Sequence, residues 1–167
     1  IYQYETTSLE SKGIIETDHT NWIFALDTCA SYLISGSSDK TVRSWDIETS
    51  KHLFTLQGHS NQVRAIHSMN ENLVVSGSYD KTAILWDIRS KDNIGTVKLN
   101  GAVYSLGSVG RLLFSGEEEG CFHVWDSRNL SEPVAEGRGH SEPIYDFQCQ
   151  SSKLYTCSSD QYVNVWS

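Results

Sequence analysis

Histidine, serine or threonine, and aspartate recur together in this chain, and these are the residue types of a nucleophilic hydrolase. In such enzymes a histidine takes the proton of a hydroxyl nucleophile while an aspartate orients the imidazole. The set occurs three times, each time with a following tryptophan: His19, Ser35, Asp39 and Trp45; His59, Ser76, Asp80 and Trp86; His140, Thr156, Asp160 and Trp166. Three copies are too many for one active site, and the sequence has no GxSxG turn and no GxxxxGK[ST] loop. We therefore predict a structural role for these residues and no catalytic site.

Metal-ligating residues show no spacing that is typical of a metal site. The four cysteines form no CxxC pair, the arrangement that holds many structural zinc ions. The separation of His59 and His67 fits neither one face of a helix nor a zinc finger. We expect no metal, no cofactor and reduced thiols, as in most proteins of the cytosol or nucleus.

Four tryptophans mark a repeat. They follow one another at intervals of 41, 39 and 41 residues: Trp45, Trp86, Trp125 and Trp166. Each closes a version of one phrase: LISGSSDKTVRSWD, LVVSGSYDKTAILWD, LLFSGEEEGCFHVWD and LYTCSSDQYVNVWS. An acidic residue or glycine followed by histidine stands upstream of three of them: Asp18-His19, Gly58-His59 and Gly139-His140. A period near 40 residues with a GH-type start and a WD-type end resembles the WD40 family of β-propellers, from about Leu9 to the last residue.

This resemblance implies an all-β fold, a WD40 β-propeller with about four blades of four antiparallel strands in this chain. Short runs rich in Val, Ile, Leu and aromatic residues alternate with Gly, Ser, Asn and Asp clusters, as β-strands and turns require. We expect one WD40 repeat region over residues 1–167. It divides into a blade remnant and four repeats, each led by its outer strand: 1–17, about 18–46, 47–87, 88–126 and 127–167.

The resemblance also implies that the ring is larger than this chain. Members of the family have seven or eight blades, and a ring of four would be too tight for this repeat. We expect a part of a larger propeller, or half of an eight-blade ring made by two copies. The N-terminal strand around Lys12–Thr17 is expected to complete the last blade.

In WD40 proteins the recurring residues form a buried tetrad, in which the Trp indole bonds the hydroxyl, the hydroxyl bonds His, and His bonds Asp. The resemblance implies this role for the three sets above, since each polar group then has a partner. Repeat three departs from the pattern, with Asn100 in place of His and Glu119 in place of Asp. We expect a broken relay and a looser blade there. The triplet Glu117-Glu118-Glu119 is either a solvated turn or an anchor for Lys or Arg of a partner.

Propellers bind partners on the narrow face, around the central channel. The resemblance places three exposed positions there per repeat: the third and fifth residues after the His, and the residue before the tetrad Asp. Five of these twelve are Trp, Phe or Tyr, against 11% aromatic residues in the chain. Aromatic and Arg side chains carry much of the binding energy of protein interfaces. The alternative is that some of these rings pack between blades. We expect seven rim residues to contact a partner: Trp22, Phe24, Arg64, Tyr79, Tyr104, Glu118 and Tyr145.

A second candidate surface lies at two strand ends. Trp86-Asp87-Ile88-Arg89 and Trp125-Asp126-Ser127-Arg128 are consecutive WDxR endings. They resemble the motif of WD40 substrate receptors that dock on the cullin-4 ubiquitin-ligase adaptor, and the repeats are also similar to those of F-box and RING ligases. Arg89 and Arg128 are therefore candidates for adaptor docking. The alternative is that each arginine pairs with a neighbouring carboxylate in solvent.

Charge and hydropathy limit the partners. The formal net charge is −8, whereas a surface that follows nucleic-acid phosphates needs clustered Lys and Arg. No apolar run approaches the roughly 20 residues of a membrane span. The sequence predicts a noncatalytic scaffold in the cytoplasm or nucleus that binds proteins or peptides, basic ones in particular. The alternative is a substrate receptor or adaptor of a ubiquitin ligase of the cullin-4, F-box or RING type.

Overall fold

The computed structural model describes residues 1–4, 11–150 and 152–167, and it consists of antiparallel β-sheets. Blade 1 contains β3 (Ile23–Cys29), β4 (Tyr32–Ser37), β5 (Thr41–Asp46) and β6 (His52–Gln57). Blade 2 contains β7 (Val63–Ser68), β8 (Leu73–Ser78), β9 (Thr82–Asp87) and β10 (Asp92–Lys98). Blade 3 contains β11 (Val103–Val109), β12 (Leu112–Glu117), β13 (Cys121–Asp126) and β14 (Ala135–Arg138). Blade 4 contains β15 (Ile144–Gln150), β16 (Lys153–Ser158) and β17 (Val163–Trp166).

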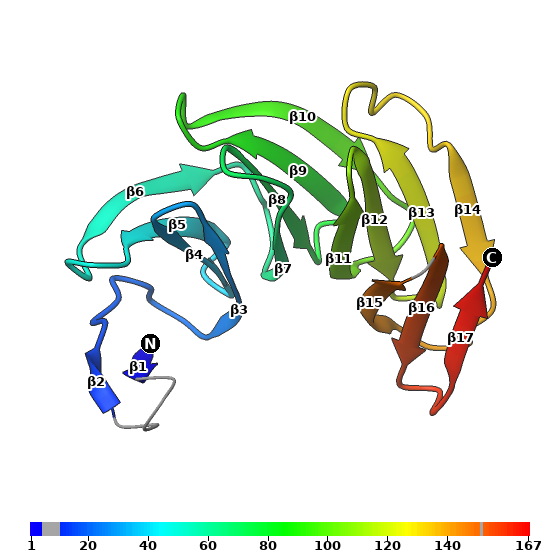
Figure 1. Ribbon diagram of the computed structural model, residues 1–167, viewed down its shortest axis with the longest axis horizontal. Helices are drawn as coiled ribbons and strands as arrows, with labels where there is room; N and C mark the ends of the chain where they lie inside the picture. The colour runs from blue at the N-terminus through cyan, green and yellow to red at the C-terminus, as the bar shows by residue number, and fades with distance from the viewer. Residues whose placement is uncertain (5–10, 151) are drawn as a thin grey trace.

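The blades stand side by side in an open arc, with the two chain ends at opposite ends of it (Figure 1). In every blade, strands that follow one another in the sequence are neighbours in the sheet. The first strands of successive blades, β3, β7, β11 and β15, contact one another along the inner side of the arc. The predictions of an all-β fold and of propeller blades are therefore confirmed.

The N-terminal strand does not complete the last blade, so that expectation was wrong. β2 (Ser11–Ile14) pairs with β1 (Tyr2–Tyr4) in a separate two-stranded sheet. The Ile15 N–H extends the pairing by donating to the carbonyl of Ile1 at 2.7 Å. Local antiparallel pairing satisfies these backbone groups, whereas the arc holds β2 far from β17 (Figure 1). Leu9, where the resemblance was taken to begin, lies outside the described residues.

Apolar side chains are buried between neighbouring blades. The cluster between blades 1 and 2 includes Ile34, Val63 and Trp86, and the next cluster includes Val103 and Trp125. These are the large residues of the repeat, and each contributes on the order of 1.5–3 kcal/mol when fully buried. The repeat period thus places one Trp in each inter-blade layer.

Close approach of the blades requires glycine in the second strand. A Cβ atom added at Gly36 would lie 2.7 Å from Cγ1 of Val63, and one at Gly77 would lie 2.5 Å from Cγ1 of Val103. No real side chain fits at such distances unless the neighbouring blade moves. The Ser-Gly pair of the first three repeats therefore sets how tightly the first strand of the next blade packs.

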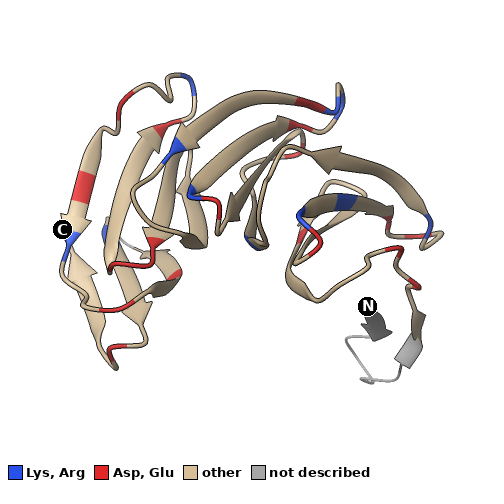
Figure 2. Ribbon diagram, turned by 180° about the vertical axis from the view of Figure 1, so that it is seen from behind, with Lys and Arg blue, Asp and Glu red and all other residues tan. Residues whose placement is uncertain are grey.

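Charged residues, membrane spans and cysteines show no special feature in the described residues. Lys and Arg are dispersed over loops and strands rather than gathered on one face (Figure 2). Among the described residues, no helix is long and apolar enough to span a membrane. All four cysteines are free thiols: Cys29, Cys121, Cys149 and Cys157. Burial raises the pKa of the first three thiols, which makes them poor nucleophiles near neutral pH.

Candidate functional site

The set of recurring polar residues in blade 1 forms one hydrogen-bonded chain. The Trp45 indole N–H donates to the Ser35 hydroxyl at 2.9 Å. Ser35 Oγ lies 2.8 Å from His19 Nε2, and His19 Nδ1 lies 2.8 Å from Asp39 Oδ2. The carboxylate only accepts, so Nδ1–H donates to Asp39 and Nε2 accepts from Ser35. The chain ties the loop before β3 to β4, β5 and the turn between them.

Blades 2 and 4 repeat this geometry. His59 lies 2.9 Å from Asp80 and 2.7 Å from Ser76, and the Trp86 indole donates to Ser76 at 2.7 Å. In blade 4 the distances are 2.8 Å for His140–Asp160, 2.8 Å for His140–Thr156 and 2.9 Å for Trp166–Thr156. The period of the sequence therefore brings the same four kinds of side chain together in each of these blades: Trp, a hydroxyl residue, His and Asp.

These tetrads are unsuited to hydrolysis. The hydroxyls of Ser35, Ser76 and Thr156 belong to buried residues, so a substrate has no path to them. Burial lowers the pKa of His19 and of His59, against the opposing effect of the neighbouring carboxylate, which leaves both rings neutral at pH 7. A hydroxyl that is already bonded on both sides and closed off from solvent is a structural link.

Blade 3 rebuilds the polar link from other positions. Asn100 and Glu119, which stand where the His and Asp were expected, are both exposed. Instead, Nδ1 of His123 contacts the Glu117 carboxylate, and both side chains are buried. The Trp125 indole still donates to Ser115, at 3.2 Å. The expected break at Asn100 is present, but a buried pair that the sequence analysis missed replaces the lost contact.

One sequence signal for this pair was available. His123 lies in β13 at a position where blade 1 has Arg43 and blade 2 has Ile84. Its partner Glu117 stands where both of those blades have serine. A new His and a new Glu within one repeat, both in strands, indicate a compensating pair. The triplet of glutamates was predicted to be either a solvated turn or an anchor for Lys or Arg of a partner; Glu118 and Glu119 are exposed, whereas Glu117 is buried.

The rim residues are positioned by a recurring irregularity of the first strand. In each blade the pairing of the first and second strands skips one residue: Phe24, Arg64, Tyr104 and Tyr145. A β-bulge of this kind turns the skipped side chain away from its regular direction. The four bulges therefore present an aromatic or Arg side chain at the same place in four successive blades.

The rim residues contact one another across the blades. The Arg64 guanidinium carbon lies 4.3 Å from the Phe24 ring centroid and 5.7 Å from each of the Tyr79 and Tyr104 centroids. The Tyr79 hydroxyl donates to the Tyr104 hydroxyl at 3.0 Å, and the Tyr104 and Tyr145 rings meet at 5.6 Å. Burial and the neighbouring Tyr79 raise the pKa of Tyr104, so the phenol stays protonated. Phe24, Arg64, Tyr79 and Tyr104 are consequently half-buried in a contact network.

The ends of this network are open to solvent. Trp22, in edge contact with Phe24, is 75% exposed, and Tyr145 is 48% exposed. Glu118 is also exposed, in the turn that follows β12. Arg64 forms no ion pair within the part of the chain that the structure describes, and its Nε atom is buried without a hydrogen-bond partner. The rim therefore offers two large exposed rings and an uncompensated cation.

The two WDxR arginines are bound to their own turns. Arg128 donates to the Asp126 carboxylate from Nε at 3.0 Å and from Nη2 at 2.7 Å. Arg89 approaches Asp87 at 3.9 Å and is largely exposed. Both side chains remain accessible, but each has the neighbouring carboxylate that the alternative interpretation expected.

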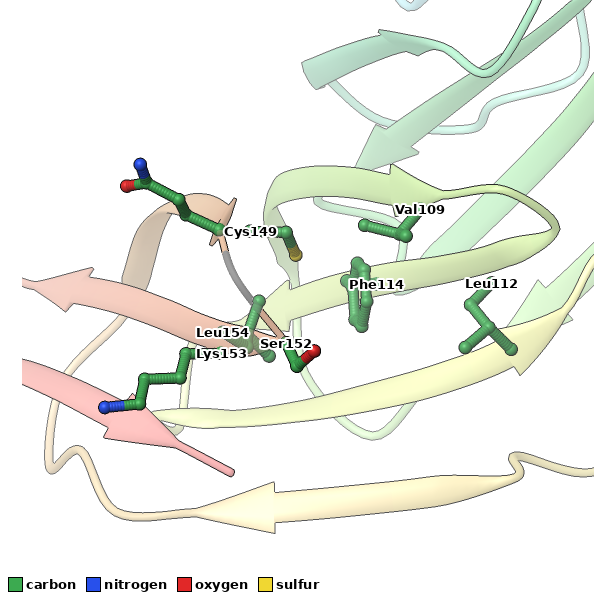
Figure 3. A pocket seen from close by; sticks show the side chains of 8 residues that line it. Val109, Leu112, Phe114, Cys149, Ser152, Lys153 and Leu154 are labelled. Atoms are coloured by element: carbon green, nitrogen blue, oxygen red, sulfur yellow. The ribbon is translucent and has the colours of Figure 1, made fainter.

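A cavity of about 330 Å³ lies between blades 3 and 4 (Figure 3). Its walls are mainly apolar and include Val109, Leu112, Phe114 and Leu154, with Cys149 at one side. These residues come from the ends of β11, β12, β15 and β16, away from the rim bulges. The cavity brings together no acid–base pair that would support catalysis.

Known proteins resemble the chain over most of its length. The family model "WD domain, G-beta repeat" matches residues 12–46, 50–87 and 131–167. Sterol regulatory element-binding protein cleavage-activating protein of Xenopus laevis is 33% identical over 148 residues, or 89% of this chain and 8% of that protein. The probable E3 ubiquitin ligase complex SCF subunit sconB of Arthroderma otae is 44% identical over 50 residues, or 29% of this chain and 7% of that protein.

The solved structures include a close match in shape. The crystal structure of the computationally designed Ika4 protein matches with a TM-score of 0.78 at 29% identity, over 89% of this chain and 92% of that one. By contrast, the chain spans less than a tenth of the length of the two natural relatives named above. The matched family segments leave out β11, β12 and β13 of blade 3, where the tetrad is rebuilt.

Proposed function

The chain belongs to the WD40 repeat family, and from that premise we propose that it is a noncatalytic scaffold that binds proteins or peptides through its rim residues. Proteins of this family generally act as scaffolds without catalysis. The observation that carries the proposal is the set of four β-bulges, which present Phe24, Arg64, Tyr104 and Tyr145 from successive blades. Bulges are features that aim side chains, often at binding sites.

The composition of the rim suits a protein ligand. Trp22 and Tyr145 expose large rings that lose little conformational entropy on binding. Arg64, stacked on Phe24 and without an ion pair in the described residues, favours an acidic group of the ligand. Glu118 favours a basic group beside Tyr104. A peptide segment with apolar anchors and charges of both signs meets these requirements.

Peptide selection tests the proposal directly. A random peptide library displayed on phage is selected against the purified chain, and the selected peptides are measured by fluorescence polarisation. Tyr79→Ala and Tyr104→Ala are expected to weaken binding by more than about 1 kcal/mol, or about fivefold, because each removes a central ring of the rim. Both variants are expected to retain the circular dichroism spectrum of the native protein.

Arg89→Ala provides the matched control for these rim variants. It removes an exposed side chain on a turn, outside the rim network, so peptide affinity is expected to stay within about twofold of the native value. Peptides that bind all three variants equally would refute the rim as the binding surface.

A second function, substrate receptor or adaptor of a ubiquitin ligase, has one specific observation in its favour. The sconB subunit shares 44% identity with a 50-residue segment of this chain. For a receptor of the cullin-4 type, the WDxR endings are the separate observation: Arg89 and Arg128 contact the ligase adaptor, and binding breaks their exposed pairs with Asp87 and Asp126. Pull-down with a purified cullin-4 adaptor distinguishes the two functions: the arginine variants lose it under this proposal, whereas the tyrosine variants lose only peptide.

We also propose that further blades complete the ring, supplied by a longer polypeptide or by a second copy of the chain. The support is the open arc and the exposed apolar residues at its end. In β17, Val163 and Val165 are more than half exposed, and the strand pairs only with β16 in the part that the structure describes. Such an edge is a ready site for further pairing.

A further inference from the structure

The buried pair of blade 3 belongs to a cluster of three metal-ligating side chains. A carboxylate oxygen of Glu117, the sulfur of Cys121 and a ring nitrogen of His123 all lie within 4.8 Å of one another, and all three residues are buried. We propose that this cluster binds a divalent transition-metal ion of the zinc type. Zinc is commonly held by such a combination of sulfur, nitrogen and oxygen ligands.

Strand geometry brings the three groups to one place. Glu117 ends β12 and Cys121 begins β13, with a turn between them that includes Gly120 at a φ of +73°. The register pairs Ser115 with His123, so Glu117 and Cys121 are the next same-face positions toward the turn. Alternate residues of a strand point to the same face, which places Cys121 and His123 side by side. The ligands are thus attached to two paired strands, which gives a rigid support.

Only blade 3 has this combination. At the positions of Glu117, Cys121 and His123, the other blades have residues that offer no comparable ligand set: Ser37, Thr41 and Arg43; Ser78, Thr82 and Ile84; Ser158, Tyr162 and Asn164. The same blade lacks the histidine of the tetrad, since Asn100 stands in its place and is exposed. Blade 3 therefore has three metal-ligating residues where the other blades have none as a set, and it is also the blade that lacks the tetrad histidine.

A cation would compensate the buried charge of Glu117. This side chain is completely buried and is bonded to the His123 ring and, more weakly, to the Gly101 N–H at 3.3 Å. A fully buried carboxylate is costly without a positive partner, and a divalent ion supplies two positive charges. The ion takes the place of the Nδ1 proton of His123, which moves to Nε2 and faces the Glu136 carboxylate, and Cys121 binds the ion as the thiolate after releasing its proton to solvent.

The surroundings of His123 fit a metal ligand. Its Nδ1 faces Glu117, while its Nε2 lies 3.5 Å from the carboxylate of Glu136 on β14. A carboxylate on the far nitrogen is the usual outer partner of a metal-bound histidine, because it fixes the orientation of the ring. His123 also lines a cavity of about 240 Å³ together with Asn100 and Trp125, which gives an ion a route from solvent.

Cobalt substitution tests the site on the whole chain. The protein is treated with a chelator, desalted and titrated with Co²⁺ alone. We expect one equivalent of Co²⁺ to produce the near-ultraviolet charge-transfer band of a cobalt–thiolate bond, and we expect Zn²⁺ to abolish it. Cys121→Ser is expected to lose this band, since it removes the sulfur. The variant should fold, because the equivalent positions of blades 1 and 2 carry the hydroxyl residue Thr.

Cys149→Ser is the matched control, because this thiol lies outside the cluster and should leave the band unchanged. Glu117→Gln keeps the size of the side chain but removes its charge, and is expected to weaken Co²⁺ binding by about tenfold or more. This variant decides the question if Cys121→Ser does not fold. The proposal is overturned if the native protein gives no thiolate band, if Cys121→Ser retains it, or if Glu117→Gln binds as tightly as the native protein.

Discussion

Replacement of His59 with alanine tests whether the tetrads hold the blades together. The His59 ring is buried and links the loop before β7 to β8 and to the turn after β8, through contacts of 2.7 Å to Ser76 and 2.9 Å to Asp80. The substitution removes both hydrogen bonds and the longer contact of 3.2 Å between Thr82 Oγ1 and His59 Nδ1, and it leaves a void beside Ser76. The Trp86 indole still donates to Ser76, but the serine hydroxyl loses the acceptor for its own proton.

The expected loss of stability follows from what the partners retain. Asp80 keeps bonds from the Ser60 N–H at 2.8 Å and the Thr82 hydroxyl at 2.6 Å, so it is not left as a bare buried charge. The loss of stability therefore comes from the buried Ser76 hydroxyl, which lacks an acceptor, and from the Asp80 carboxylate, which loses one of its hydrogen bonds; together these cost about 1–3 kcal/mol. Asn100→Ala, at the equivalent but exposed position of blade 3, is expected to change stability by less than about 0.5 kcal/mol.

A third variant addresses blade 3 itself. His123→Ala removes the ring that contacts the fully buried Glu117 and, among the described residues, leaves this carboxylate with the Gly101 N–H alone. Breaking a buried pair by removing one partner costs about 3–5 kcal/mol. We expect a loss of stability at least as large as that of His59→Ala. Such a loss would mean that the Glu117–His123 pair stabilises blade 3 in place of the tetrad.

Urea unfolding at pH 7 measures all three variants. With a slope of about 1–3 kcal/mol per M, His59→Ala should lower the midpoint by roughly 0.5–1.5 M at an unchanged slope. The reasoning would be refuted if Asn100→Ala and His59→Ala gave equal midpoints, or if His123→Ala gave the midpoint of the native protein.

Three further predictions concern pH, packing and assembly. Burial lowers the pKa of His59 from 6.5, so just below that pH the unfolded state binds more protons than the folded state. The urea midpoint should therefore fall as the pH is lowered from 7 through 6. A midpoint that rises would contradict a neutral His59 ring in the folded protein. Gly77→Ala should cost about 1–3 kcal/mol because its Cβ would meet Val103 at 2.5 Å, and a thermal melt identical to that of the native protein would contradict the packing argument. The chain should self-associate at low micromolar concentration in sedimentation experiments, and Val165→Lys should reduce this association; a stable native monomer would count against completion of the ring by a second copy.

Much of the fold could be predicted from residue spacing. The recurring Trp86, Trp125 and Trp166 place one Trp in each of the three layers between the blades, and the short apolar runs between turn residues predict the strands. Both signals are local or strictly periodic, so a single sequence displays them. For the same reason the sequence predicts the tetrad residues that contact one another in blades 1, 2 and 4.

Other features depend on contacts that the repeat period does not predict. The Glu117–His123 pair exists because two paired strands turn these side chains to one face, and repeat three differs from its neighbours at both positions. The pairing of β2 with β1 rather than with blade 4 depends on the distance between the ends of the arc.

The rim shows the same division. The sequence alone determined which residue types recur at the rim positions, because the repeat register is carried by the chain itself. The tertiary structure decided that Phe24, Arg64, Tyr104 and Tyr145 are skipped in strand pairing and that Arg64 stacks on Phe24 of the preceding blade. A bulge depends on how two strands share their hydrogen bonds, and a contact between blades depends on how sheets pack, so both are settled only when the whole arc has formed.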